Sequence, residues 1–353
     1  MLFMLYAIVV TLFLPFVFNG VTVFEDKNVD DSVVQGGVPL HFNLNNITQI
    51  GYISLNSITL LFLWVNKHKV DCKMLRTSFY IAILIVLIIG FWEFLSKTTG
   101  AFPYPVNFFR NNAEGMIYEG EAFGVMRMSS LLGEASFCGA FLAASFWASL
   151  CMGKKKYYIL SAFILLAIIF NLSGTGIMAF ILGSLIYVLF KGFHIKVLGT
   201  LVFIASLLII VLFISGYGEF FFDMIFTKSD TGSGMNRMEA LLKSLDLILQ
   251  TYGFGVGMGS HRGSEFLLDL IAQIGVLGAY LFFCIYKKLI YRLKKEHLYL
   301  FVYALVLMLA QCLSIPDFSY SPMWMVLFIA ASYNKKDLKR HEVDIRATVQ
   351  SSL

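Results

Sequence analysis

Charged residues are scarce in this sequence. They make up 14% of its 353 residues, whereas 58% of the residues are hydrophobic. A soluble globular domain carries about 25% charged residues, so this composition excludes that class. Apolar runs of about 17 to 20 residues recur instead, long enough to cross a bilayer as helices, and the alternating ten-residue pattern of a membrane β-barrel is lacking. The sequence therefore predicts an all-α polytopic membrane protein.

Recognisable nucleotide-binding and metal-binding patterns are lacking as well. The sequence contains no P-loop and no Rossmann glycine pattern, which argues against a pump or a kinase. The cysteines form no CxxC motif and no Cys/His cluster, so we expect no metal and no cofactor. All but Cys72 are expected to be small buried residues. The five cysteines lie at positions 72, 138, 151, 284 and 312.

A cleavable leader and a transporter-like repeat are lacking too. Residues 1–18 carry no basic n-region, and no clear A-x-A site follows, so we interpret them as a retained membrane helix. No pair of interrupted helices occupies matching positions in two halves, as an inverted-repeat transporter would have. The net charge of +5 does not predict a nucleic-acid partner, because the basic residues are distributed by membrane side.

Ten apolar segments are predicted to span the membrane. Both termini are placed in the cytoplasm (N-in/C-in), because the loops after every second helix then hold most of the 27 lysines and arginines, as the positive-inside rule requires. The predicted spans are about residues 2–19, 47–65, 77–96, 128–151, 157–170, 176–190, 197–215, 264–286, 298–313 and 322–333.

These spans predict a single membrane domain over residues 1–333, followed by a basic cytoplasmic tail, 334–353. The two largest polar loops, 97–126 and 216–262, face outward in this topology, as does the turn at 315–321. A site built from these loops acts outside the cytoplasm, where nucleoside triphosphates are absent.

The first candidate site residues lie on the predicted span 128–151. Arg127 and Glu134 are seven residues apart, so a continuous helix would place them on one face, with Ser130 between them. An ionisable residue inside the membrane costs several kcal/mol unless it faces a wet cavity or a partner. Glu134 is therefore either a substrate-facing carboxylate with an arginine above it or half of a structural ion pair.

The outward loop 216–262 contains a predicted amphipathic helix over residues 236–250, with Asn236 as its N-cap. This helix either covers the bundle or takes part in a site. Arg237 falls in its first turn, where the helix dipole disfavours a cation. The misfit suggests that Arg237 has another partner, such as an anion.

A glycine-rich turn, G-F-G-V-G-M-G-S-H-R-G-S-E-F (253–266), leads into the next span. Alternating glycines allow the backbone to turn sharply or to approach a ligand, and a helix N-terminus beside Arg262 favours a phosphate. His261 is either an ordinary surface residue or a functional one. Glu265, Asp269 and Gln273 follow at four-residue steps and predict a polar stripe that faces the bundle interior or a cavity.

Two shorter motifs complete the pattern. They are the turn N-L-S-G-T-G (171–176) and the segment S-Y-S-P-M-W (319–324). Tyr320 and Trp324 in the second motif are either part of an interfacial aromatic belt or platforms on which sugars stack.

In order and topology, the motifs resemble those of Wzy-type O-antigen polymerases, within the group that includes the O-antigen ligases. The segment R-M-S-S-L-L-G-E-A-S-F-C-G (127–139) is similar to the family pattern R-x-x-G-x-x-x-E-P-S-x-x-G. Ser130 stands at the first glycine of that pattern and Ala135 at its proline. Three further matches lie at L-S-G-T-G (172–176), at the glycine turn and following helix (253–278), and at P-M-W (322–324).

The resemblance implies a glycosyltransferase C-type fold and a function in O-antigen or related surface polysaccharide synthesis. The protein would polymerise undecaprenyl-diphosphate-linked oligosaccharide repeat units at the outer face of the bacterial cytoplasmic (inner) membrane. Membrane lipid and a chain-length regulator protein are further expected partners. Ligases of the group carry a His-Asn pair where Ser264 and Glu265 stand here, which favours a polymerase. The alternatives are a ligase acting on a lipid A core and a non-catalytic transporter or flippase of an anionic glycolipid.

Roles can be assigned within this reading. We rank Glu134 first, His261 second and Glu265 third as the group that accepts the proton of the acceptor hydroxyl. The lipid diphosphate would be bound by Arg237 and Arg262, with Arg127 as a weaker candidate, because arginine matches phosphate geometry and no metal cluster is evident. The sugar would contact Tyr320 and Trp324.

Overall fold

The computed structural model describes residues 1–24, 37–69, 72–105, 108, 121–122, 125–192 and 232–333. Three predictions fall outside these residues: the span at 197–215, most of the outward loop 97–126, and the tail 334–353.

Helices dominate the described part of the chain. The α-helices are α1 (Leu2–Val17), α3 (Leu44–Val65), α4 (Cys72–Thr99), α6 (Ala135–Cys151), α7 (Lys155–Asn171), α8 (Gly174–Lys191), α11 (Gly232–Gln250), α12 (Phe266–Ile290), α13 (Leu298–Ser314) and α14 (Ser321–Ser332). A short 3-10 helix, η2, covers Ser130–Leu132. Two antiparallel hairpins pair β1 (Thr22–Val23) with β2 (Val38–Pro39) and β3 (Glu121–Ala122) with β4 (Val125–Met126).

The helical membrane class is confirmed. Every predicted span within the described residues corresponds to an observed helix, and α11 is the predicted helix of the outward loop. Within the described ranges, α3, most of α4, α8 and α12 are long and apolar enough to cross a bilayer by length and composition alone. The helices α1, α6, α13 and α14 are apolar but shorter. Ten spans and the glycosyltransferase C-type fold stay predictions.

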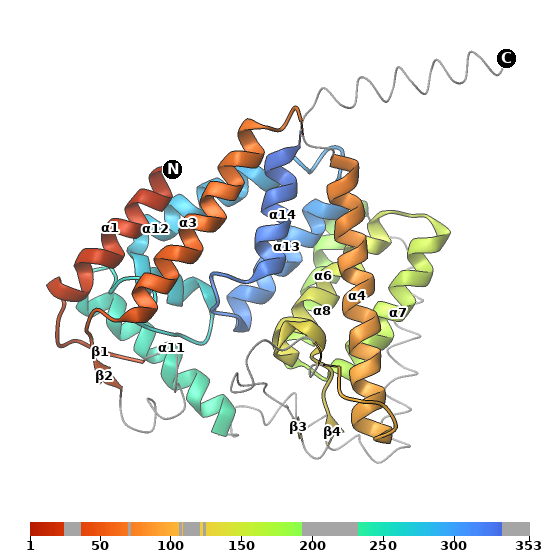
Figure 1. Ribbon diagram of the computed structural model, residues 1–353, viewed down its shortest axis with the longest axis horizontal. Coiled ribbons are helices and arrows are strands. Elements are labelled where there is room, and N and C mark those ends of the chain that lie inside the picture. Colours follow the sequence, from red (N-terminus) through yellow and green to blue (C-terminus); the bar gives the residue numbers. More distant parts are fainter. Residues whose placement is uncertain are drawn as a thin grey trace.

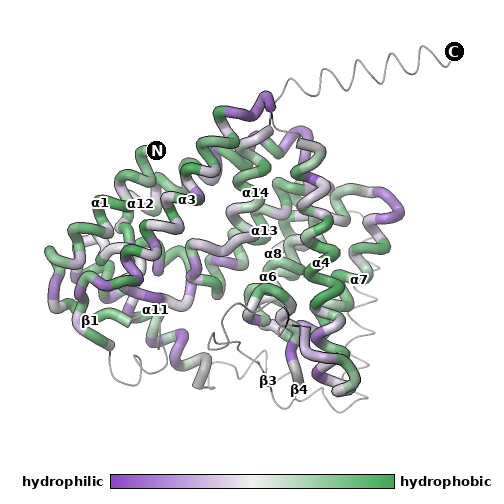
Figure 2. The backbone as a smooth tube through the Cα atoms, in the orientation of Figure 1, coloured by the Kyte–Doolittle hydropathy of each residue, from purple (hydrophilic) through white to green (hydrophobic). Residues whose placement is uncertain are grey.

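The helix ends are arranged as the charge pattern requires. The N-terminus, the end of α14 and the hydrophilic turns after α3, α6 and α12 lie at one end of the bundle, whereas α11 and both hairpins lie toward the other (Figures 1 and 2). The turns at the first end carry the lysines of 154–156 and 287–295. The basic turns and the elements that were predicted to face outward therefore occupy opposite ends of one bundle.

The core is centred on α6. Every residue of this helix except Phe137 is buried, and α6 packs against α7, α8 and α13. Gly139 of α6 and Gly176 of α8 allow these two helices to touch, because a Cβ on either glycine would lie 2.9 Å from the Cα of the other. The close approach brings the segment 127–139 beside the turn at 172–176.

The glycine-rich turn has a structural task that its sequence did not predict. Helix α12 is broken at Gly275, whose φ is 74°. The amides of Val256 and Gly257 donate to the carbonyls of Ala272 and Gln273, at 2.9 and 2.8 Å, and the Val276 amide donates to Gly253. The turn thus satisfies backbone groups that the break exposes, as buried peptide groups require. The amides of Val256, Gly257 and Val276 are therefore used within the protein, and the alternating glycines serve a sharp turn.

This fit predicts a large stability difference between two glycines of similar φ. At Gly255 (φ +90°) an added Cβ would lie 2.6 Å from the Gln273 carbonyl oxygen, whereas at Gly20 (φ +88°) it would meet nothing within 4 Å. We expect Gly255→Ala to destabilise the protein by about 2–4 kcal/mol, from strain plus overlap, and Gly20→Ala by about 1 kcal/mol, from strain alone. Thermal unfolding in detergent measures both. Equal losses would show that the contact with α12 contributes nothing.

Candidate functional site

The segment from Arg127 to Glu134 is not the continuous helix that its sequence predicts. Ser130 has φ +53° and Gly133 has φ +80°, so the chain turns twice before α6 begins. Glu134 is the N-cap of α6, and Arg127 lies upstream, between β4 and η2, outside any helix or strand. The prediction that Arg127 and Glu134 share a helix face is therefore wrong. They are brought near each other by the turn instead.

The left-handed conformation of Ser130 explains one departure from the polymerase pattern. The pattern has glycine at this position, and glycine adopts positive φ without the Cβ penalty that other residues incur. Serine is held there by two bonds: its amide donates to Glu93 at 2.6 Å, and its hydroxyl donates to the Val86 carbonyl at 2.8 Å.

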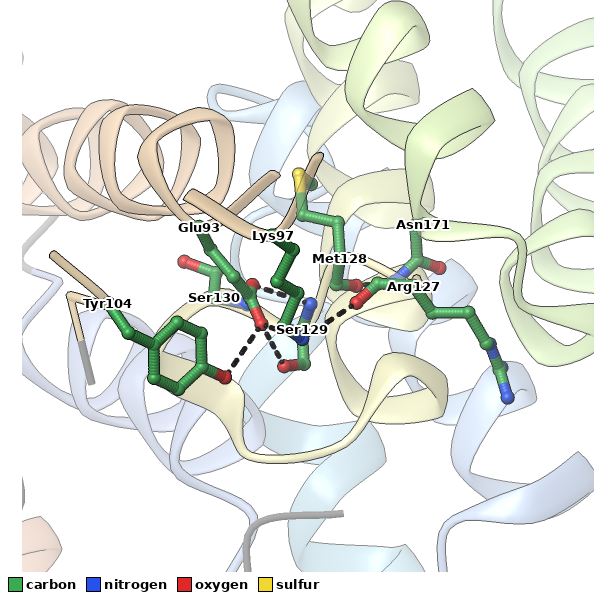
Figure 3. A network of polar contacts seen from close by, with 8 residues as sticks. All are labelled: Glu93, Lys97, Tyr104, Arg127, Met128, Ser129, Ser130 and Asn171. Carbon is green, nitrogen blue, oxygen red and sulfur yellow. Dashed lines mark hydrogen bonds and ion pairs between the residues drawn. The ribbon is translucent and has the colours of Figure 1, made fainter. Parts of the chain in front are cut away.

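Glu93 of α4 is the centre of the polar network that holds this turn (Figure 3). Its side chain is completely buried. One carboxylate oxygen accepts the amides of Ser129 and Ser130, at 2.8 and 2.6 Å. The other accepts the Ser129 hydroxyl and the Lys97 ammonium, both at 2.8 Å, and the Tyr104 hydroxyl at 3.3 Å.

Arg127 points away from this network. In Figure 3 its side chain leaves the turn on the side opposite Glu93, while its carbonyl accepts from Lys97 at 3.3 Å. Its Nε is buried and has no hydrogen-bond partner among the described residues. Burial and the positive charge of Arg237 lower the pKa of Arg127, and Glu134 partly opposes them. Arg127, Arg237 and Glu134 are thus close enough for their charges to interact.

Arg237 reaches this place from α11. Its Nη1 donates to the Ser314 hydroxyl at 2.7 Å, and Thr175 donates to the same oxygen at 2.7 Å. Three elements therefore meet here: α11, the start of α8 and the end of α13. Helix α11 begins at Gly232, so the predicted N-cap at Asn236 is wrong and Arg237 lies in the second turn. The dipole argument for Arg237 does not hold, although it does have a partner.

Glu265 lies near the same end of α13. It is the half-buried N-cap of α12 and makes no capping bond through its side chain. Burial raises its pKa, and its charge acts on Cys312, two residues before Ser314. Asp269 and Gln273 do face the interior, where they hold the glycine turn: Asp269 accepts the Gly263 amide at 2.6 Å, and Gln273 accepts the Gly259 amide at 2.9 Å.

His261 is buried and tied on both sides of its ring, with only 2% of its surface exposed. Nδ1 lies 3.3 Å from the Phe24 amide, which donates to it, and Nε2 lies 2.9 Å from the Ser244 hydroxyl. Ser244 gives its own proton to the Ala240 carbonyl, so Nε2 carries the hydrogen. This geometry supports a neutral histidine that joins the loop to α11, rather than a proton acceptor facing a substrate.

Its environment predicts a pH effect on stability. Burial, helped by the charge of Lys243, lowers the pKa of His261 from 6.5 to about 3. Below pH 6.5 His261 is protonated in the unfolded chain but stays neutral in the folded chain. The free energy of unfolding therefore decreases by about 1.4 kcal/mol for each unit that the pH is lowered, until about pH 3. The stability advantage of the wild type over His261→Gln should therefore shrink by about 2 kcal/mol between pH 7.5 and 5. An unchanged difference in unfolding temperature would contradict this.

Arg262 is half-buried next to His261, and its amide donates to the Phe24 carbonyl at 2.9 Å. This backbone bond joins Arg262 to the β1–β2 hairpin, whereas Arg237 is bonded to the end of α13.

Tyr320 and Trp324 are core residues, which contradicts both interpretations of their sequence motif, an aromatic belt at the membrane interface and a platform for sugars. They are 3% and 5% exposed, which leaves no ring face for a sugar and none for a lipid interface. The Tyr320 hydroxyl donates to the Phe137 carbonyl at 2.7 Å, and the Trp324 indole donates to Phe318 at 2.8 Å. Their polar groups anchor the start of α14 to α6 and to the preceding turn.

Three site residues lie outside every sequence motif, Glu93, Lys97 and Ser314, and a fourth, Thr175, lies in the L-S-G-T-G motif but was given no role. A signal existed for the first two, because an acid and a base at i and i+4 in an otherwise apolar span are costly unless they serve a purpose. Thr175 and Ser314 carry no such signal. Within the described residues, no three His, Cys, Asp or Glu side chains are grouped so that they could hold a metal.

Comparison with known families gives one match. The family model described as WcaD colanic acid polymerase matches residues 52–279. The matched region includes Glu93, Arg127, Glu134 and Arg237, whereas Ser314 follows it. No curated protein and no solved structure matches the chain.

Proposed function

Because the chain belongs to the WcaD colanic acid polymerase family, a Wzy-type polymerase family, we propose that it joins lipid-linked oligosaccharide repeat units into a surface polysaccharide. The donor is a growing glycan on undecaprenyl diphosphate, and the acceptor is the next lipid-linked unit. The reaction takes place at the outer face of the bacterial inner membrane. The single observation that carries this proposal is that the charges of both Arg237 and Glu134 act on Arg127, with Arg237 bonded to Ser314 where α11 meets the end of α13.

The chemistry asks for two kinds of group. The acceptor oxygen forms a bond to the anomeric carbon while the bond from that carbon to the diphosphate breaks, so negative charge develops on the leaving diphosphate. Preorganised cations stabilise such charge best where water is excluded. The acceptor hydroxyl loses its proton to a base within hydrogen-bond reach.

Arg127 and Arg237 supply the cations. Two guanidinium groups repel each other in a partly buried place, so an anion between them removes a cost that the free protein carries. The Nε of Arg127, which has no hydrogen-bond partner in the described part of the chain, offers a hydrogen bond that a phosphate oxygen accepts. Arg262 is the third candidate, at the other end of the loop.

Glu134 is the proposed base. It stands at the N-cap of α6, near Arg127, and one of its oxygens accepts the Ser136 hydroxyl at 2.9 Å. Glu265 is the second candidate, because it lies near the end of α13 that Arg237 contacts. His261, with both nitrogens bonded inside the protein, ranks third.

Purified protein supplied with one defined lipid-linked repeat unit tests the function. A ladder of products that lengthens with time supports polymerisation. Transfer to a lipid A core acceptor without a ladder identifies a ligase. Binding or movement of the intact glycolipid, with neither a ladder nor a lipid A core product, identifies a transporter. The ligase result and the transporter result each overturn the proposal. If a chain-length regulator protein is a partner, adding it should narrow the distribution of product lengths in the ladder.

The outward orientation is tested by labelling cysteines in intact cells. In a cysteine-depleted background, Gln250→Cys at the exposed end of α11 should react with a membrane-impermeant maleimide. His68→Cys, in the exposed turn after α3, should react only after the membrane is opened, because the two positions lie at opposite ends of the bundle. Equal labelling of both in intact cells would contradict the proposed topology.

A further inference from the structure

Glu93 lies outside every motif that pointed to the site, yet it makes more polar contacts than any of the motif residues described above. It is completely buried and comes from α4, about 35 residues upstream of the turn that it holds. A buried carboxylate costs several kcal/mol unless it is paired and hydrogen-bonded. Lys97 neutralises it at 2.8 Å, and two backbone amides bind one oxygen. Because burial of this carboxylate is unfavourable even when it is paired, we expect its contacts to serve a role.

The contacts of Glu93 fix the backbone from which Arg127 extends. Glu93 binds the amides of Ser129 and Ser130, and Lys97 binds the carbonyl of Arg127. From the other side, Asn171 at the end of α7 donates to the carbonyl of Met128. Residues 127–130 are thus held between α4 and α7, and Ser130 is kept in its left-handed conformation.

This restraint matters because the place where Arg127 points is unfavourable for it in the free protein. Burial and Arg237 both act against its charge, and its Nε lacks a partner among the described residues. A flexible arginine would turn away to water or to an acid. A backbone clamped on both sides removes that freedom, so the cost of holding the guanidinium ready is met on folding and not on binding.

We propose that Glu93, paired with Lys97, is a positioning residue that aims Arg127 at the diphosphate of the lipid-linked substrate. Glu93 acts through the backbone of Ser129 and Ser130 and does not touch the substrate. The inference rests on the proposed function for the identity of the anion, and on the described contacts for everything else.

Glu93→Gln is the single substitution that most directly tests this positioning role. The amide keeps the size of the side chain, but one of its two ends is now a donor. That donor faces either two backbone amides or the Lys97 ammonium, so part of the clamp opens in both orientations. Because a buried unpaired lysine could also impair folding, the double variant Glu93→Gln/Lys97→Met removes both charges together.

A double-mutant cycle with Arg127 separates positioning from general stability. Binding of undecaprenyl diphosphate, which carries no sugar, is measured for the folded fraction of detergent-purified protein. In the wild-type background we expect Glu93→Gln to raise Kd about tenfold, and the double Glu93/Lys97 variant to do the same. In the Arg127→Gln background the same changes should raise Kd less than about twofold, because the aimed group is already gone.

The control is Asp246→Asn, which breaks the partly exposed Lys243–Asp246 ion pair on α11 and should leave Kd unchanged. Equal weakening by Glu93→Gln in both backgrounds, or no weakening in either, overturns the inference. Wild-type protein that binds undecaprenyl diphosphate with the expected coupling but yields no ladder from repeat units overturns the polymerase proposal and leaves the positioning role standing.

Discussion

Glu134→Gln should still bind the lipid-linked substrate but form polymer about 10²–10⁴ times more slowly than the wild type, the range that general-base catalysis contributes. Glutamine has the size of glutamate, and its amide oxygen can still accept the Ser136 hydroxyl, which lies 2.9 Å from the carboxylate. What it loses is the ability to take the proton of the acceptor hydroxyl. The substitution therefore separates a chemical role from a structural one.

The measurement compares the rate of the first elongation step with the Kd of the donor in the same preparation. Glu239→Gln is the matched control, because Glu239 is an exposed glutamate on α11 and should behave as the wild type. A normal elongation rate in Glu134→Gln would make Glu134 structural, a partner that only holds Arg127 in place. Glu265, whose pKa burial already raises, would then be the next base to test.

Arg127→Lys and Arg237→Lys should each raise the Kd of the lipid diphosphate about tenfold or more, and the elongation rate should fall with it. Lysine keeps the positive charge but not the planar fork that binds two phosphate oxygens at once. For Arg237 the change also breaks the 2.7 Å bond to Ser314, which orients the guanidinium. Arg262→Lys is the third variant to compare, because the Arg262 amide is bonded to Phe24 of the β1–β2 hairpin and not to the elements that Arg237 contacts.

Binding normalised to the folded fraction distinguishes this effect from loss of structure. Arg292→Lys serves as the control, because Arg292 binds the Tyr333 carbonyl and stacks on Trp64 at the other end of the bundle. Arg292→Lys should lower the unfolding temperature of the protein without weakening its binding of the lipid diphosphate. Full affinity in both Arg127→Lys and Arg237→Lys would remove the two-arginine site, whatever the fate of Glu134.

The relative weight of the arginines was not predictable from sequence. The helix dipole favoured an anion at Arg237, the helix N-terminus favoured one beside Arg262, and Arg127 was the weaker candidate. In the structure the positive charge of Arg237 acts on Arg127, and Arg237 itself is bonded to Ser314. Helical spacing also placed Glu134 inside a span, although Gly133 ends the turn and Glu134 caps the next helix. The error over residues 127–134 came from extending a helix across residues whose conformation distant groups decide.

The sequence by itself determined the membrane class, the positions of nearly all the helices in the described residues, and a family resemblance that the match over residues 52–279 confirms. These follow from hydrophobicity, charge and short motifs, which a local window contains. Only the tertiary structure decided the breaks at Ser130 and Gly275, the burial of His261 and the clamp by Glu93. Each depends on partners far away in the chain: Glu93 lies 37 residues from Ser130 and Phe24 lies 237 from His261. A backbone group freed by a broken helix is satisfied only when folding brings such a partner to it.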